Sequence, residues 1–366
     1  MQPHTSPQPR KFRKDVNGLR AIAVLAVLLF HLFSYLKTSL PSLDVFNGGY
    51  IGVDIFFVIS GFLMTAIIVR GLHAGTFSVW NFWKRRASRI CPALMVLVIV
   101  VLLVGFFIQL PYVFRETCRE AFRGMLFISN FWLARDQGYF AESVVNETLL
   151  HTWSLSVEWQ FYLLYPLLLL AWGKLCSLRT IPHFIGAMLA VSLATSFILT
   201  SDKSYFMLHT RAWELLLGGI IFTLPPLNLK AGLTRLLECS ALVVVVLNIA
   251  LAEPMRGWDV LQVLPGVLAS ALILWLNVER SLLSNALMQY TGKISYSLYL
   301  IHWPVIVVCS KLGLLHYFLP ILGGIVIYAA LSYHFIETKR RWHWSIVLIY
   351  ALVIALAIVG NKNKGV

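Results

Sequence analysis

Apolar residues form long runs along most of the chain, and short polar segments separate the runs. A transmembrane helix needs about 20 apolar residues to cross the roughly 30 Å hydrocarbon core of a bilayer. Eleven runs meet or approach this length. The pattern predicts an all-α polytopic transmembrane bundle of about 10–11 spans, at residues 20–36, 50–70, 91–112, 159–173, 182–200, 212–225, 235–252, 260–277, 294–312, 317–334 and 345–360.

The distribution of basic residues predicts the orientation of this bundle. With the N-terminus in the cytoplasm, the cytoplasmic segments hold 19 of the 30 Lys and Arg residues. Cytoplasmic loops of membrane proteins normally carry such an excess. We therefore expect a cytoplasmic N-terminus. We also expect residues 1–341 to form a ten-span membrane domain, with one further span and a short extracytoplasmic tail in residues 342–366.

Composition supports a membrane protein and narrows its partners. The chain is 59% hydrophobic and only 13% charged, with a mean hydropathy of +0.77. A soluble fold of this composition would lack the polar residues to cover its surface. The net charge is +14, and the basic residues lie mostly between the apolar runs. We therefore expect membrane lipids and an anionic ligand as partners, and no nucleic acid. The five cysteines are scattered without a ligand-like spacing, which predicts no metal site.

The first span contains two ionisable residues, Arg20 and His31. A charged group at membrane depth costs several kcal/mol and is therefore a functional candidate. Eleven residues of helix place the two side chains on one face, roughly 16 Å apart along the axis. We expect Arg20 to bind an anion at the cytoplasmic end and His31 to transfer a proton. The alternatives are an arginine that snorkels to the interface and a histidine that bonds a neighbouring helix.

Two further arginines, Arg86 and Arg89, precede the third span. Residues three apart on a helix are neighbours on one face. Paired guanidinium groups suit a phosphate, which they can bind through parallel N–H donors. Contact with lipid headgroups is an equal alternative from spacing alone.

Two carboxylates are predicted near the outer ends of spans. Asp54 lies about one turn into the second span, where it can either orient a histidine or pair with Arg211. Glu158 lies near the start of the fourth span, close to Trp153. We take both carboxylates as catalytic candidates. Trp153 is either a platform for a sugar ring or part of the interfacial aromatic belt.

Three residues in later spans are candidate substrate ligands. Arg211 and Glu214 are three apart in the sixth span, where a local ion pair is the alternative. His302 lies near mid-depth in the ninth span. It can face His31, bind substrate, or serve as a packing group.

Several motifs occur in one order over residues 13 to about 341. Together they resemble integral-membrane acyltransferase family 3, the O-antigen acetylase-like proteins of bacteria. The matching segments are Arg20-x10-His31, FFVISGFLM, RRASRICPAL, WSLSVEWQFY, RAWELLLGG, GKISYSLYLIHWPV and FIETKRR. The resemblance implies an enzyme of the bacterial cytoplasmic (inner) membrane. It would move an acyl group, usually acetyl, from cytoplasmic acyl-CoA to a hydroxyl of a cell-surface glycan, such as O-antigen lipopolysaccharide or exopolysaccharide.

The resemblance also implies roles and partners. Arg20, His31, Arg86 and Arg89 match positions held essential in the family. The glycan acceptor can be free or lipid-linked, and larger members append an extracytoplasmic domain. A separate protein is an alternative source of that domain here. His31 can act as a general base or carry the acyl group covalently. The rival function is a transporter or flippase of a lipid-linked sugar or organic anion, but such folds usually show two related halves, and none is visible.

Overall fold

The computed structural model describes residues 13–36, 46–135, 147–199, 203–253, 259–278, 281–339 and 344–363. Regular structure in these ranges is helical throughout and contains no strand, which confirms the all-α prediction. The main helices are α1 (Lys14–Leu36), α2 (Ile51–His73), α3 (Val79–Ile108), α4 (Pro111–Met125), α5 (Ser129–Leu133), α7 (Thr152–Leu175), α8 (Ile181–Ile198), α9 (Leu208–Thr223), α10 (Ala231–Leu251), α11 (Val260–Leu276), α12 (Ala286–Lys311), α13 (Phe318–Ser332) and α14 (Trp344–Asn363).

Each of the eleven predicted spans coincides with a helix. Among the described residues, eight helices are long and apolar enough to cross a membrane, and α11 and α14 have shorter apolar stretches. The predicted boundaries were less accurate than the predicted elements. Helix α3 begins at Val79 and α7 at Thr152, because both continue the span into a polar flank that itself favours helix.

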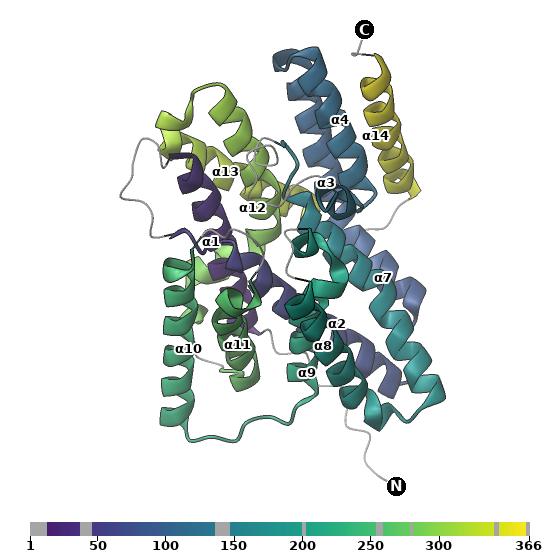
Figure 1. Ribbon diagram of the computed structural model, residues 1–366, viewed down its shortest axis with the longest axis vertical. Coiled ribbons are helices and arrows are strands. Elements are labelled where there is room, and N and C mark those ends of the chain that lie inside the picture. The colour runs from purple at the N-terminus through teal and green to yellow at the C-terminus, as the bar shows by residue number, and fades with distance from the viewer. Residues whose placement is uncertain are drawn as a thin grey trace.

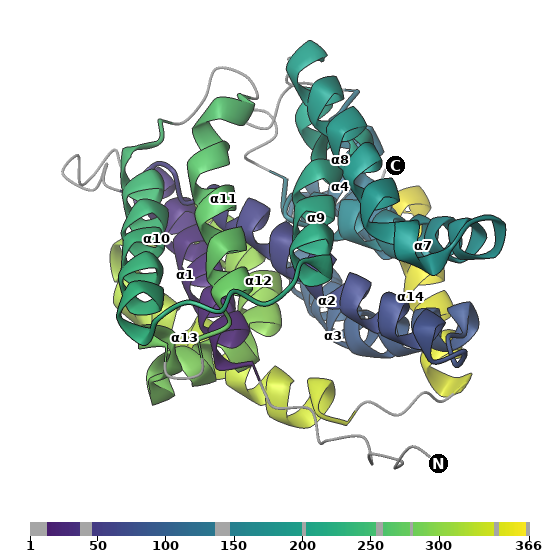
Figure 2. The same ribbon diagram turned by 90° about the horizontal axis from the view of Figure 1, so that it is seen from below.

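Helix α2 lies at the centre of the bundle. It packs against α1, α7, α9 and α11, and Figure 2 shows these helices gathered around it. Helices α10, α11, α12 and α13 surround α1 on one side (Figure 1). Helices α4 and α14 pack side by side at the end of the molecule where the chain ends (Figure 1). Residues of α1, α2, α3, α7 and α12 line one common space between the helices.

Two glycines let α2 and α9 approach closely. A Cβ atom on Gly61 of α2 would lie 1.6 Å from the carbonyl oxygen of Leu215, and one on Gly218 of α9 would lie 1.9 Å from that of Val58. Small residues at a membrane helix interface allow such backbone contact, which favours packing and weak Cα–H···O bonds. The contact also fixes the distance between the charged residues that α2 and α9 carry.

Replacing Gly61 by alanine is expected to push α2 and α9 apart. Both approaches are to backbone oxygen, so no side-chain rotation can make room. We expect a loss of about 1–3 kcal/mol or more, seen as a lower denaturation temperature of the detergent-solubilised protein. Gly323→Ala is the matched control, because no heavy atom lies within 4 Å of its added Cβ. Equal stability of the two variants would contradict the close approach.

Candidate active site

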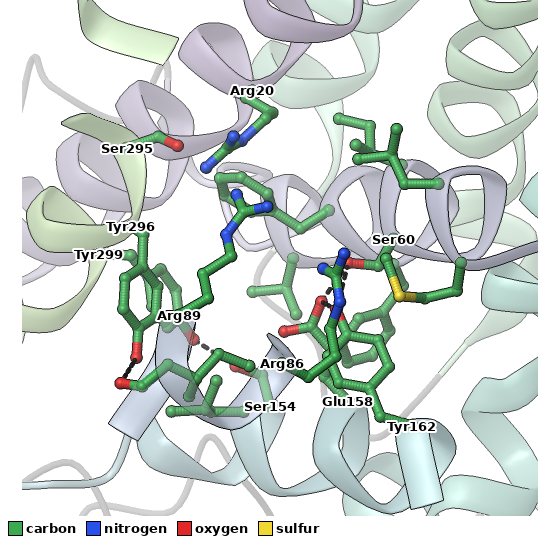
Figure 3. Close-up of a pocket in the computed structure, with 18 residues that line it drawn as sticks. Arg20, Ser60, Arg86, Arg89, Ser154, Glu158, Tyr162, Ser295, Tyr296 and Tyr299 are labelled. Carbon is green, nitrogen blue, oxygen red and sulfur yellow. Dashed lines mark hydrogen bonds between the residues drawn. The ribbon is translucent and has the colours of Figure 1, made fainter. Parts of the chain in front are cut away.

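An interior cavity collects three of the predicted arginines. Arg20 of α1 and Arg86 and Arg89 of α3 line it, together with residues of α2, α7 and α12. Figure 3 shows Arg20 entering from one side and Arg86 and Arg89 from the other. Arg20 and Arg89 belong to helices that are distant in sequence, yet they face one space. The cavity volume is about 100 Å³.

The start of α3 explains the position of the arginine pair. Ser78 caps the helix, and its Oγ accepts a hydrogen bond from the Asn81 N–H at 3.3 Å. The polar segment that follows is therefore helical before the apolar run begins. Arg86 and Arg89 lie one turn apart on the same face, and both line the cavity. The structure thus brings together the pair that the spacing predicted.

A second, wider pocket lies next to the first and shares Arg86 and Arg89 with it. Arg70 from the end of α2 and Arg85 from α3 line it together with Arg86 and Arg89, and its volume is about 660 Å³. Four guanidinium groups in one pocket create a strongly anion-attracting site. Sequence reasoning missed Arg70, which is exposed at the end of a span and looked like an ordinary cytoplasmic charge.

Glu158 lines the arginine cavity, whereas the sequence analysis placed it near the outer end of its span, apart from the predicted cytoplasmic arginines. Its carboxylate accepts a hydrogen bond from the Tyr162 hydroxyl at 2.5 Å and another from Ser60. Arg86 lies over the Tyr162 ring, with 5.7 Å between the guanidinium carbon and the ring centroid, and Figure 3 shows it beside Glu158. Because α7 begins at Thr152, Glu158 is about two turns inside the helix.

His31 and His302 form a buried pair. The Nδ1 atom of His31 lies 2.9 Å from Nε2 of His302, and the two rings are inclined by only 15°. His31 is 5% exposed and His302 is fully buried. The indole of Trp303 contacts His31 edge-on, with 4.5 Å between ring centroids. Of the alternatives for His302, the structure shows the one in which it faces His31. Its role as a substrate ligand stays a prediction.

Sequence reasoning missed a third histidine in this cluster. His151 precedes α7, and its ring centroid lies 6.0 Å from that of His302. The Tyr299 hydroxyl is 2.5 Å from Ser154 Oγ and donates to the His151 carbonyl oxygen at 3.0 Å. Tyr299 and Ser154 also line the arginine cavity, whereas His31 does not. Tyr299 therefore stands between the cavity and the histidines.

Asp54, Arg211 and Glu214 form a fully buried ionic group. Arg211 donates to Asp54 at 2.8 Å, and its Nε lies 3.1 Å from a Glu214 oxygen. The ring of Trp153, which is 1% exposed, lies over this guanidinium, with 5.6 Å between the ring centroid and the guanidinium carbon. A sugar platform needs an accessible ring face, so Trp153 does not provide one in this structure. Asp54 takes the structural alternative, pairing with Arg211.

Glu337 is another buried carboxylate, and the sequence analysis gave it no role. It closes a π-helical turn, Tyr333–Glu337, after α13. Ser297 of α12 donates to it at 2.5 Å, and it interacts electrostatically with Arg20. π-Helical turns occur frequently at functional sites. Glu337 belongs to the FIETKRR motif, whose glutamate was the available signal.

Glu120 of α4 anchors the segment that precedes His151. Its carboxylate accepts a hydrogen bond from the Leu149 N–H at 2.8 Å. Two residues earlier, the Glu147 carbonyl accepts from the Trp303 indole at 2.8 Å. Burial, together with the nearby Glu147 charge, raises the pKa of Glu120 to about 8. The segment Glu147–His151 is therefore held against the histidine cluster by a carboxyl group that is protonated at neutral pH.

The raised pKa of Glu120 predicts that stability falls as pH rises. The unfolded chain binds fewer protons than the folded one between the ordinary glutamate pKa and about 8. Stability contributed by this group is complete below that window and is lost as pH rises through it. We expect Glu120→Gln to flatten the decline in denaturation temperature between pH 5 and pH 8. Asp259→Asn, which alters the exposed cap of α11, is the control. An unchanged slope in Glu120→Gln would contradict the assignment.

Comparison with known proteins gives these features a context. A family model described as an acyltransferase domain matches residues 13–360. The O-acetyltransferase OatA of Staphylococcus aureus is 29% identical over 90% of this chain and 57% of its own length. A putative O-acetyltransferase of the same species is 30% identical over 98% of this chain and 65% of its own length. The chain thus spans less than two thirds of either relative. No solved structure matches it.

Proposed function

Because the chain belongs to acyltransferase family 3, we propose that it transfers an acyl group, acetyl in the first instance, to a hydroxyl of a cell-surface glycan. The donor would be acyl-CoA presented on the cytoplasmic side of the bacterial inner membrane. The acceptor class includes O-antigen, other lipopolysaccharide sugars and exopolysaccharide, free or lipid-linked. The O-acetyltransferase names of the relatives support the acetyl group.

The observation that carries this proposal is the pair of adjoining pockets that share Arg86 and Arg89. The wider, four-arginine pocket suits the phosphates of a nucleotide, which guanidinium groups bind through paired N–H donors. The narrower cavity is lined by Arg20, Tyr299 and Ser154 as well. A long donor with an anionic head and a slender acyl-bearing arm matches this shape. A simple inorganic anion would use only the outer part.

The reaction would take place beyond Tyr299, at His31. In the base mechanism, His31 removes the proton of the acceptor hydroxyl as the oxygen attacks the thioester carbonyl. The thiolate then leaves and takes up a proton. In the covalent mechanism, His31 attacks the thioester carbonyl and the thiolate leaves. The acceptor hydroxyl then attacks the acyl-imidazole, takes the acyl group and gives its proton to the released imidazole. Both mechanisms require Tyr299 to move, because its side chain separates the cavity from the histidine pair.

Doubly labelled donor tests the function. Inside-out and right-side-out membrane vesicles containing the protein would receive acetyl-CoA labelled either in the acetyl group or in the adenine. We expect only acetyl label to become covalently attached to glycan, and only when the donor reaches the cytoplasmic face. Arg179→Lys, at an exposed site, serves as the matched control for variants of the arginine pockets.

The transporter alternative makes the opposite prediction in the same vesicles. Labelled glycan lipid or organic anion would cross the membrane without gaining acetyl label. That result, with no covalent transfer from either vesicle orientation, would overturn the acyltransferase proposal.

A further inference from the structure

The hydrogen bonds of His302 determine which of its nitrogens carries a proton. Its Nδ1 lies 2.7 Å from the Tyr299 carbonyl oxygen and 3.2 Å from that of Leu298. A carbonyl oxygen only accepts hydrogen bonds, so Nδ1 of His302 must be the donor. In the neutral ring, Nε2 is then left as an acceptor with a lone pair.

The protonation of His302 also determines which nitrogen of His31 carries a proton, because the two rings are hydrogen-bonded. Nε2 of His302 lies 2.9 Å from Nδ1 of His31. Because the first is an acceptor, the second must carry a proton. The neutral His31 ring then has its lone pair on Nε2, the nitrogen opposite His302. The tautomer of one histidine thus follows from backbone carbonyls that contact the other.

We infer that His302 is a positioning residue that holds His31 in the tautomer whose Nε2 is basic. The inference rests on the proposed function, in which His31 is the reacting imidazole. When Nε2 takes the proton of the acceptor hydroxyl, Nδ1–H remains bonded to His302, and the bond becomes charge-assisted. His302 occupies the place at Nδ1 that a carboxylate takes in a Ser-His-Asp arrangement. Unlike a carboxylate, it orients the ring without adding a negative charge to the buried site.

The helix around His302 supports this rigid role. Leu298 and Tyr299 are one turn earlier in α12, so the ring folds back onto its own backbone. The rings of Trp303 and His31 are in contact, and Tyr299 lies with its ring centroid 5.5 Å from that of His302. His302 is fully buried among these groups. Rotation of either imidazole would break a hydrogen bond where no bulk water can replace it.

Nitrogen NMR tests the tautomer without requiring activity. The protein would be labelled with ¹⁵N-histidine and studied in nanodiscs, with the His31 signals assigned by their loss in His31→Gln. We expect the wild type to show a protonated Nδ1 and an unprotonated Nε2 at His31. In His302→Phe, which keeps a ring but offers no acceptor, we expect a shift to the other tautomer or a mixture. A protonated Nε2 in the wild type, or an unchanged His31 tautomer in His302→Phe, would overturn the inference.

Kinetics then separates positioning from packing. We expect His302→Phe to lower kcat for acetyl transfer about 10–100-fold, a part of the roughly 10²–10⁴-fold that a general base contributes, with little change in KM for acetyl-CoA. His302→Gln should recover much of the loss, because an amide can accept from His31 and also donate to a carbonyl. His316→Phe is the control, since that exposed histidine has the same Nδ1 contact with a carbonyl three residues back. Equal kcat in His302→Phe and wild type, or no recovery in a folded His302→Gln protein, would refute a positioning role.

The two measurements also keep the inference distinct from the function. If wild-type protein transferred no acetyl group, the proposed function would fail, yet the tautomer of His31 would still be read from the spectra.

Discussion

Glutamine in place of His31 is expected to lower the rate of acyl transfer about 10²–10⁴-fold, the usual contribution of a general acid or base. The amide fills much of the imidazole volume and can still donate toward His302, but it cannot take up a proton. Transfer of acetyl label to glycan, normalised to protein in the membrane, measures the effect. His183→Gln is the control, because His183 is exposed at the start of α8.

Acetylation of the wild-type protein itself distinguishes the two mechanisms for His31. Acid-quenched wild-type protein, exposed to acetyl-CoA without glycan, would carry an acetyl group on His31 only in the covalent mechanism. Mass spectrometry of the peptide containing residues 14–36 would detect it. Wild-type transfer by a normally expressed His31→Gln protein would exclude His31 from both mechanisms.

Lysine in place of both Arg86 and Arg89 is expected to raise KM for acetyl-CoA about 10–100-fold. The positive charge stays, so the topology signal is unchanged, but the planar pair of N–H donors is lost. A hydrogen bond to a charged group contributes about 1.5–3 kcal/mol, and each 1.4 kcal/mol corresponds to a factor of ten. Initial rates at varied acetyl-CoA concentration give KM directly.

This lysine variant decides between the two roles that spacing allowed for the pair. If the arginines only contacted lipid headgroups, lysine would serve equally and KM would match the wild type. Arg179→Lys provides the control for a basic residue on the same predicted side of the membrane, and its KM should not change. A normal KM in the Arg86→Lys/Arg89→Lys protein would remove the phosphate-binding role.

Sequence reasoning succeeded where the determining geometry is local. Hydropathy runs predicted a helix at each of the eleven positions, because the bilayer imposes length and composition on each helix separately. The helical repeat predicted that Arg86 and Arg89 are neighbours. Both conclusions require only the residues of one helix, so neither depends on how the helices pack.

Sequence reasoning failed where the geometry depends on contacts between helices. The position of Glu158 beside Arg86 was not predicted, because it depends on the packing of α7 against α3. The sequence could not decide between the two alternatives for Asp54. Its pairing with Arg211 depends on the close approach of α2 and α9 at Gly61 and Gly218. His151 was not predicted as a site residue, because it precedes α7 and lies outside the predicted span. Only the packing of α1, α7 and α12 brings it near His31.

On the proposed function, the two pockets that share Arg86 and Arg89 would act as one bivalent receptor for the donor. In a ligand long enough to occupy both pockets, binding of one end keeps the other end near its pocket. This raises the effective concentration of the second end at its site. A short donor such as acetyl phosphate carries the same acyl group and a similar anion, yet it can engage only one pocket at a time. The shared arginines would therefore discriminate by molecular length as well as by charge, and so keep small acyl phosphates and free anions from competing for the cavity.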